Sequence, residues 1–223
     1  EYGLNIEQIE NKLKKIIRYS NPSLNKKTLF IWPEGVFSGY HYNEILIFKE
    51  LIKKNFSKKH HIIFGVNKLE EKTGLFYNSL LLVNNEFEVI QQYNKQKLVP
   101  FGEFLPFENL LNKFGFKKIT EGHGSFQKGE DKINLKIDQL NILPLICYEV
   151  IFTKLIQEAN INTNLIVNIS EDAWFGNTIG PEQHYVKSIF RAIENGTFFL
   201  RSANKGISAI IDNRGTTIKQ LNR

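Results

Sequence analysis

The stretch LNILPLICYE, residues 140–149, joins an apolar run to reactive side chains. Residues 143–146 are typical of a buried β-strand, and Cys147, Tyr148 and Glu149 follow directly. If the backbone stays extended beyond Ile146, Cys147 and Glu149 point to the same side, because side chains alternate along a strand. An acid is costly to bury without a partner or a purpose, so this strand end is a candidate site.

Apolar runs and helical spacing predict the other elements. Strands are expected at residues 28–32, 61–66, 76–83, 87–93, 133–137, 141–148, 165–169, 197–201, 206–212 and 216–221. Helices are expected at residues 6–17, 45–56, 107–114, 152–159 and 182–194, the last with Val186, Ile189, Phe190 and Ile193 on one face. Helices and strands alternate before hairpins appear, which indicates one α/β domain with mixed sheets.

The composition is that of a globular protein. The chain has 223 residues and a mass of 25.9 kDa, with 42% hydrophobic and 23% charged residues. These values exclude a disordered tail, a fibre and a disulfide scaffold, and the single cysteine excludes an internal disulfide. The chain contains no methionine and begins at Glu1. We therefore expect a fragment of a longer protein, with a processed mature protein as the alternative.

The net charge is +6 and the isoelectric point is near 9.2, with much of the excess in residues 12–18 and 53–59. Such lysines usually form the solvated face of a helix. The alternative is attraction to an anionic surface, lipid or nucleic acid. No nucleic-acid-binding signature accompanies the charge, so nucleic acid is not expected as a partner. No stretch approaches the ~18–20 apolar residues of a membrane span.

A small set of residues has the chemistry of acyl transfer. Cys147 and Glu34 each follow an apolar run, and Lys95 and Glu103 open a long segment rich in Phe, Gly and Pro. Taken singly, each has an ordinary explanation as a core thiol or a solvated charge. Together they supply a nucleophile, a base and a donor for an oxyanion. The rival bases for the thiol are His41, His60, His61, His123 and His184, but none lies in a comparable strand-end motif.

The order Glu, Lys, Cys resembles the nitrilase, or carbon–nitrogen hydrolase, superfamily. Short sequence motifs make the resemblance more specific, because they are similar to motifs in the nitrilase-like domain of the bacterial apolipoprotein N-acyltransferases. The matching segments are 32–34 (WPE), 93–103 (YNKQKLVPFGE), 147–149 (CYE), 171–176 (EDAWFG), 180–184 (GPEQH), 191–196 (RAIENG) and 201–206 (RSANKG). They extend over nearly the whole chain, and LVPFGE and the WFG segment are specific to this family.

The resemblance implies a role for each site residue. Glu34 is then the general base, Lys95 is the donor to the oxyanion, and Cys147 is the nucleophile. Lys95 is preferred to Lys97 because it matches the lysine of the family motif Tyr-x-Lys-x-x-Leu. Glu103, Glu149 and Tyr148 are the implied supporting residues. The candidates for contacts with the substrate are Asn78, Trp174, Phe175, Gly176, Phe104 and Phe107. No cofactor is implied, and no His or Cys spacing predicts a metal site.

The resemblance also implies a fold and a setting. The implied fold is a four-layer α-β-β-α sandwich. Residues 1–223 are then one catalytic domain, which is expected to be truncated at both ends and to lack the flanking transmembrane helices of the family. The reaction transfers an acyl chain from a phospholipid, through a thioester on Cys147, to the N-terminal amine of an apolipoprotein. The domain would face the periplasm on the inner membrane of a bacterium. The apolar residues from 104 to 116 would form a lid at the membrane surface, or else pack in the core.

Two alternatives remain open at this point. A soluble amidase or nitrilase would use the same three residues with water as the final acceptor. A non-catalytic module that binds a membrane surface would keep the fold, although binding alone does not require Glu34, Lys95, Glu103 and Cys147 together.

Overall fold

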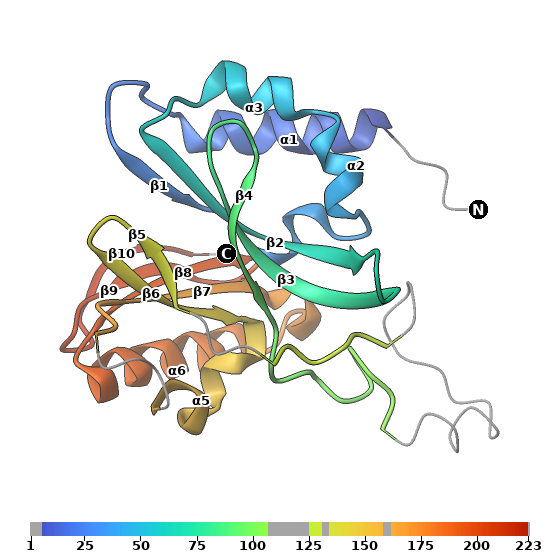
Figure 1. The fold of residues 1–223 in the computed structure, drawn as a ribbon. Helices are drawn as coiled ribbons and strands as arrows, with labels where there is room; N and C mark the ends of the chain where they lie inside the picture. The colour runs from blue at the N-terminus through green and yellow to red at the C-terminus, as the bar shows by residue number, and fades with distance from the viewer. Residues whose placement is uncertain (1–5, 107–124, 131–133, 158–161, 223) are drawn as a thin grey trace.

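Two β-sheets lie face to face between two layers of helices (Figure 1). The computed structural model describes residues 6–106, 125–130, 134–157 and 162–222. Most of the N-terminal half forms one sheet with its helices, and the C-terminal half forms the other. The predicted four-layer α-β-β-α sandwich is therefore confirmed.

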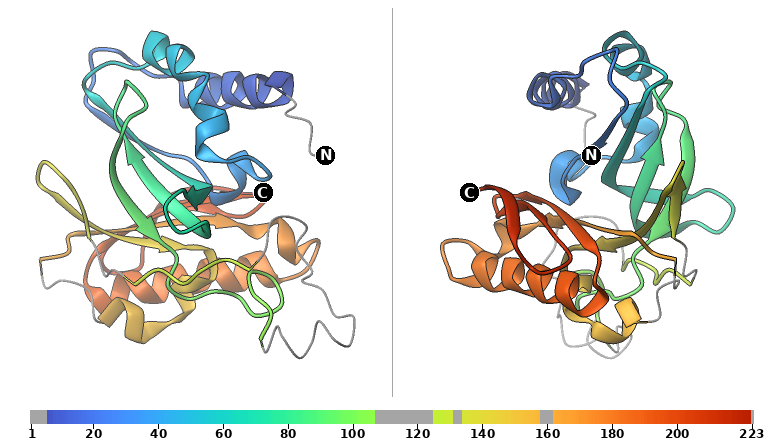
Figure 2. Two further views of the ribbon diagram at one scale, coloured as in Figure 1. Left: turned by 45° about the vertical axis from the view of Figure 1, so that its right-hand side comes forward. Right: turned by 90° about the vertical axis from the view of Figure 1, so that its left-hand side faces the viewer.

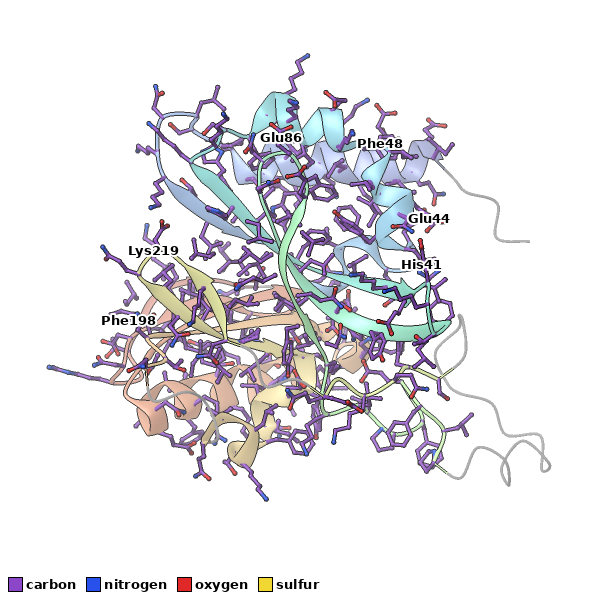
Figure 3. All side chains as sticks on the ribbon, in the orientation of Figure 1. His41, Glu44, Phe48, Glu86, Phe198 and Lys219 are labelled. Carbon is purple, nitrogen blue, oxygen red and sulfur yellow. The ribbon has the colours of Figure 1, made fainter. Side chains whose placement is uncertain are left out.

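The first sheet has the strand order β1-β2-β3-β4. Its strands are β1 (Thr28–Ile31), β2 (His60–Glu70), β3 (Leu75–Val83) and β4 (Val89–Asn94). β1 runs parallel to β2, whereas β2, β3 and β4 pair antiparallel. The β3–β4 hairpin reaches the helical layer at its tip, where Glu86 lies 2.7 Å from Lys53 Nζ (Figure 3).

The second sheet has the order β10-β9-β8-β7-β6-β5. Its strands are β5 (Leu135–Ile137), β6 (Leu140–Ile146), β7 (Leu165–Glu171), β8 (Phe198–Asn204), β9 (Ser208–Ile211) and β10 (Thr217–Leu221). The central strands β6, β7 and β8 are parallel. β5 pairs antiparallel with β6, β9 pairs antiparallel with β8, and β10 pairs antiparallel with β9. Parallel strands bring their carboxyl ends to one edge, the usual place for a site in an α/β fold.

Helices cover the outer face of each sheet, as the turned views also show (Figure 2). α1 (Ile6–Ser20), α2 (Tyr42–Leu46) and α3 (Lys49–Asn55) accompany the first sheet, and α5 (Thr153–Gln157) and α6 (Gly180–Asn195) the second. The prediction of a single helix over residues 45–56 is wrong. The chain turns at Ile47 and Phe48, so that Ile45 of α2 and Ile52 of α3 both enter the same core.

Three apolar cores separate the four layers, and strand alternation explains them. On β2, Ile62, Phe64 and Val66 face the helices, whereas Ile63 faces the other sheet. On β6, Ile142 and Ile146 lie between the sheets, with Leu143 and Leu145 packed toward α5 and α6. The central strands of each sheet are thus buried on both faces, and β2, β3, β6 and β7 contain continuous apolar runs in the sequence.

Only one member of the predicted apolar stripe of α6, Ile189, packs against the core. Val186, Phe190 and Ile193 are each between two fifths and one half exposed. The buried face carries His184, Ser188, Arg191 and Ala192 instead. The helix was predicted correctly, but its orientation is set by buried polar contacts described below rather than by its apolar stripe.

A prediction concerns Gly65 of β2, which lies against the backbone of Glu34. A Cβ atom at this position would lie 2.6 Å from Glu34 Cα and 2.8 Å from its carbonyl oxygen. Gly65→Ala should lower the free energy of unfolding by about 1–3 kcal/mol, because backbone must move to admit the methyl group. The control is Gly102→Ala, whose nearest neighbouring atom would be 3.5 Å away. Equal denaturant midpoints for the two variants would contradict this packing.

Candidate active site

The predicted site residues come together where several strands end. Glu34 opens a short 3-10 helix, Glu34–Phe37, soon after β1, and Lys95 follows β4. Cys147 opens a second 3-10 helix, Cys147–Ile151, directly after β6. A third, Asp172–Phe175, follows β7. Elements from both sheets therefore contribute side chains to one place.

Lys95 lies at the centre of the charged groups. Its Nζ is 2.9 Å from Glu103 Oε1 and 3.7 Å from Glu34 Oε1. The residue is 1% exposed. Burial alone would lower the pKa of Lys95, but the negative charges of Glu34, Cys147, Glu103 and Glu149 outweigh burial and raise this pKa. The ammonium form is thus the stable one, which suits a group that must stabilise an oxyanion.

Asn78 of β3 holds the two carboxylates in place. Its amide nitrogen Nδ2 donates to Glu34 Oε1 at 2.8 Å and to Glu103 Oε1 at 2.7 Å. The second oxygen of Glu34 accepts from the backbone N–H of Glu171 at 3.0 Å, and that of Glu103 accepts from the N–H of Val99 at 2.9 Å. Asn78 thus orients the two acids, and its contact with substrate stays a prediction.

Cys147 occupies a sharp turn. Its φ angle is +49°, in the left-handed region, which costs a residue other than glycine about 1–3 kcal/mol. Burial and the nearby charge of Glu34 raise the pKa of the thiol to about 12, against the lowering effects of Lys95, the Ser170 hydroxyl and the Glu171 amide. At neutral pH the thiol is therefore protonated. A nucleophile in this state needs a base, and Glu34 is the carboxylate whose charge acts on it.

The expectation that Cys147 and Glu149 share one side of an extended strand is wrong, because the helix of residues 147–151 begins at the cysteine. Glu149 is fully buried and accepts four hydrogen bonds. Oε1 accepts from the Tyr93 hydroxyl and the N–H groups of Gln96 and Lys97, and Oε2 accepts from the N–H of Ile146. Burial raises the pKa of Glu149, while these bonds and Lys95 oppose the rise. Glu149 thus ties the segment after Lys95 to the turn at Cys147.

The remaining predicted residues lie around this centre. Tyr148 and Trp174 are exposed, and Phe175 packs its ring against His184. Gly176 ends the helix of residues 172–175 with a φ of +55°, and Phe104 pairs with Pro100. Nothing in these contacts tests a role in substrate binding, which stays a prediction. Phe107 lies outside the described residues.

Sequence reasoning missed a buried polar cluster behind Cys147, formed by Asn168, Asp172, His184 and Arg201. Asp172 accepts from the Ser170 hydroxyl and from Arg201 Nη2 at 2.6 Å, and its Oδ1 lies 2.9 Å from His184 Nδ1. Burial would raise the pKa of Asp172, but the hydrogen bond from His184 and the Arg201 charge lower it to about 2. The sequence carried one sign of this cluster, because Asn168 and Arg201 interrupt the apolar runs of β7 and β8.

The described residues lack a metal site and a membrane span. No group of three or more His, Cys, Asp or Glu side chains is placed to hold a metal ion there. In the same ranges, no helix is long and apolar enough to cross a membrane.

Comparison with known proteins identifies the family. The carbon-nitrogen hydrolase family matches residues 3–223. The chain belongs to this family. The chain is 36% identical over 200 residues to the apolipoprotein N-acyltransferase of Rhodopseudomonas palustris, covering 87% of this chain and 37% of that protein. It is also 36% identical to that of Bradyrhizobium diazoefficiens, over 99% of this chain and 42% of the relative. It thus spans about two fifths of the curated relatives it matches.

Solved structures of this family share the fold at low sequence identity. Nit3 from Saccharomyces cerevisiae superposes with a TM-score of 0.64 at 16% identity, covering 98% of this chain and 79% of that chain. An amidase from Nesterenkonia sp. AN1 superposes with a TM-score of 0.68 at 16% identity, covering 96% and 81% respectively. These carbon-nitrogen hydrolase structures support the layered architecture and nothing finer.

The first prediction from the site concerns Glu34. In Glu34→Gln, the pKa of the Cys147 thiol should fall below the wild-type value of about 12, because the Glu34 charge is one of the causes that raise it. The pH dependence of alkylation of Cys147 by iodoacetamide measures this pKa. The control is Glu182→Gln, an exposed acid on α6. An unchanged or higher midpoint in Glu34→Gln would refute the proposed electrostatic contact.

The second prediction concerns Glu149. In Glu149→Gln, the amide group offers one acceptor oxygen where the carboxylate offered two, so a buried N–H loses its partner. The free energy of unfolding should fall by about 1–3 kcal/mol. Denaturant unfolding compares this variant with Glu50→Gln, an exposed acid of α3. If both variants unfold at the same midpoint, Glu149 does not tie the two segments together.

Proposed function

We propose that residues 1–223 form the catalytic domain of an apolipoprotein N-acyltransferase. The observation that carries this proposal is identity of 34–36% to such enzymes over 87–99% of the chain. The buried arrangement of Glu34, Lys95 and Glu103 beside Cys147 supports it. These residues supply the base, the cation and the nucleophile that transfer of an acyl group requires.

The first half-reaction forms a thioester. Glu34 takes the proton from Cys147 Sγ as the sulfur attacks an ester carbonyl carbon of a phospholipid. The Lys95 ammonium stabilises the negative oxygen of the tetrahedral intermediate. When the intermediate collapses, the ester C–O bond breaks and Glu34 returns the proton to the leaving lysophospholipid alcohol. Glu103 and Asn78 keep Lys95 and Glu34 in position during this step.

The second half-reaction transfers the acyl group to an amine. The α-amine of a lipoprotein's diacylglyceryl-cysteine attacks the thioester carbonyl, and Lys95 again stabilises the oxyanion. Glu34 accepts a proton from the amine nitrogen and delivers it to Cys147 Sγ as the C–S bond breaks. The product is an amide, and the enzyme returns to its starting state. No cofactor takes part in this scheme.

The surroundings of Cys147 suit a lipid substrate. Tyr148 is 40% exposed, Phe152 37% and Trp174 64%. Tyr148 and Phe152 contact each other with ring centroids 6.3 Å apart, and Lys97 Nζ lies 5.9 Å from the Phe152 ring centre. Exposed aromatic rings next to a lysine are typical of surfaces that meet a phospholipid interface. From the similarity to apolipoprotein N-acyltransferases, we propose that the domain lies at the periplasmic face of a bacterial inner membrane.

A soluble carbon–nitrogen hydrolase is the competing function. It would use the same residues, with water instead of the lipoprotein amine as the acceptor. The relatives favour the acyltransferase, because the amidase structure that shares the fold is only 16% identical to this chain. The exposed rings beside Cys147 favour it too, since a small polar amide gains little from them.

The test is intact-protein mass spectrometry of the full-length protein after incubation with phospholipid micelles. The wild type should gain one fatty-acyl mass on Cys147, removable by hydroxylamine. Cys147→Ala and Glu34→Gln should gain none, and Glu182→Gln should behave as the wild type. No acyl increment together with ammonia release from a small amide would move the assignment to the hydrolase. Failure of Cys147 to form any acyl-enzyme would support a non-catalytic module.

A further inference from the structure

A buried polar cluster contacts the backbone of the proposed nucleophile, and the acyl-transfer scheme does not use it. Asn168 and Asp172 are fully buried, and His184 and Arg201 are each 3% exposed. Charged groups are expensive to remove from water, so a cluster of this kind is kept where it fixes a particular geometry. Its members come from β7, the segment after β7, α6 and β8, and two of them, Asn168 and His184, contact the same atom of Cys147.

That atom is the carbonyl oxygen of Cys147. His184 Nε2 lies 3.2 Å from it and Asn168 Nδ2 lies 3.3 Å from it. A carbonyl oxygen can only accept, so the ring donates to it from Nε2, either as the tautomer whose Nδ1 accepts from Arg201 Nη2 at 3.1 Å or as the imidazolium whose Nδ1 donates to Asp172. The β6–β7 ladder ends at the pair Ile146–Ile169, so this carbonyl lies beyond the regular strand pairing. Two side chains therefore supply the donors that a neighbouring strand would otherwise provide.

Arg201 and Asp172 hold these two donors. Arg201 lies opposite Asn168 in the β7–β8 register, and its Nη1 donates to Asn168 Oδ1. This bond directs the Asn168 amide nitrogen toward the carbonyl. Asp172 Oδ1 contacts His184 Nδ1 at 2.9 Å, and Arg201 Nη2 donates to Asp172 Oδ2. The rings of Tyr148 and Phe175 pack against His184 and complete its enclosure.

The backbone conformation of Cys147 gives this contact its importance. With φ at +49°, the residue is in a region that non-glycine residues rarely adopt, so the surrounding structure must hold it there. Rotation about the N–Cα bond of Cys147 to a negative φ would release the strain. Because Cβ and the carbonyl group turn together about that bond, the same rotation would pull the carbonyl from its two donors and change the direction of the Cα–Cβ bond. The sulfur would then move away from Glu34 and Lys95. A displacement of about 1 Å at a reacting atom can slow a reaction on the order of 100-fold.

We propose that His184 and Asn168 are positioning residues that clamp the Cys147 carbonyl and thereby aim its sulfur at Glu34 and Lys95. The proposal rests on the function proposed above for Cys147. It assigns to Asp172 and Arg201 the task of orienting the two clamping side chains.

Two substitutions of His184 separate this role from general packing. In His184→Gln, the amide nitrogen can take the place of His Nε2 and keep the bond to the Cys147 carbonyl. In His184→Asn, the amide nitrogen can take the place of Nδ1, which keeps the bond to Asp172 but loses the one to Cys147. Gln183→Asn, an exposed neighbour on α6, is the control. The readouts in the full-length protein are thermal unfolding, the KM for phospholipid and the rate of acyl-enzyme formation at saturating phospholipid.

The proposal expects His184→Gln to form the acyl-enzyme within about tenfold of the wild-type rate, and His184→Asn to be on the order of 100-fold slower. KM should be unchanged in both. Equal rates in the two variants, or a faster His184→Asn, would overturn the proposal.

If either variant fails to fold, Asn168→Asp provides the same test, because it keeps an acceptor for Arg201 and loses the donor to Cys147. A wild-type rate in Asn168→Asp would overturn the proposal. If the wild type itself forms no acyl-enzyme, the proposed function fails instead.

Discussion

The ammonium group of Lys95 is the interaction on which the rest of the site depends. Glu34, Glu103 and Glu149 are all shielded from water, and mutual repulsion would disperse three such carboxylates without a nearby cation. Lys95 Nζ contacts Glu103 directly and lies 3.7 Å from Glu34, and its charge also opposes the rise in the pKa of Glu149. The same charge that stabilises the resting acids is the one proposed to stabilise the oxyanion. The positive charge of Lys95 is therefore needed both for the stability of the resting site and for the proposed reaction.

The site exists only where the two sheets meet. Asn78 lies in the first sheet, and Glu34 and Lys95 follow its strands β1 and β4. Glu171 ends β7 of the second sheet, and Cys147 and Glu149 follow β6. Glu149 bonds to Tyr93 and to the segment after Lys95, the Glu171 N–H bonds to Glu34, and the Ser202 hydroxyl bonds to the carbonyl of Ile31. These polar contacts between the sheets fix the position of the base and the cation relative to the thiol. A slip of one sheet against the other would separate the nucleophile from its base.

Much of this organisation could be predicted from the sequence, and the failures have physical causes. Buried strands are continuous apolar runs, so nearly every strand was predicted. The resemblance of short sequence motifs to a known family indicated the proposed roles of Glu34, Lys95 and Cys147. The shared side of Cys147 and Glu149 was wrong because it assumed an extended backbone, whereas the chain turns at φ +49°. The cluster behind Cys147 was missed because its bonds join residues far apart in the chain, such as Asn168 and Arg201. On α6 the same bonds turn His184 inward and leave Val186 and Phe190 exposed.

The protonation state of Lys95 tests the account most directly. Nuclear magnetic resonance of full-length protein labelled with ¹³C,¹⁵N-lysine can follow its side chain with pH, the signal being assigned by its absence from Lys95→Arg. The account predicts that Lys95 remains an ammonium group at a pH where exposed lysines, with a pKa near 10.4, have lost their proton. In Glu34→Gln the deprotonation of Lys95 should shift to lower pH, because one of the charges that raise its pKa is gone. Loss of the Lys95 proton below the range of exposed lysines would contradict the account.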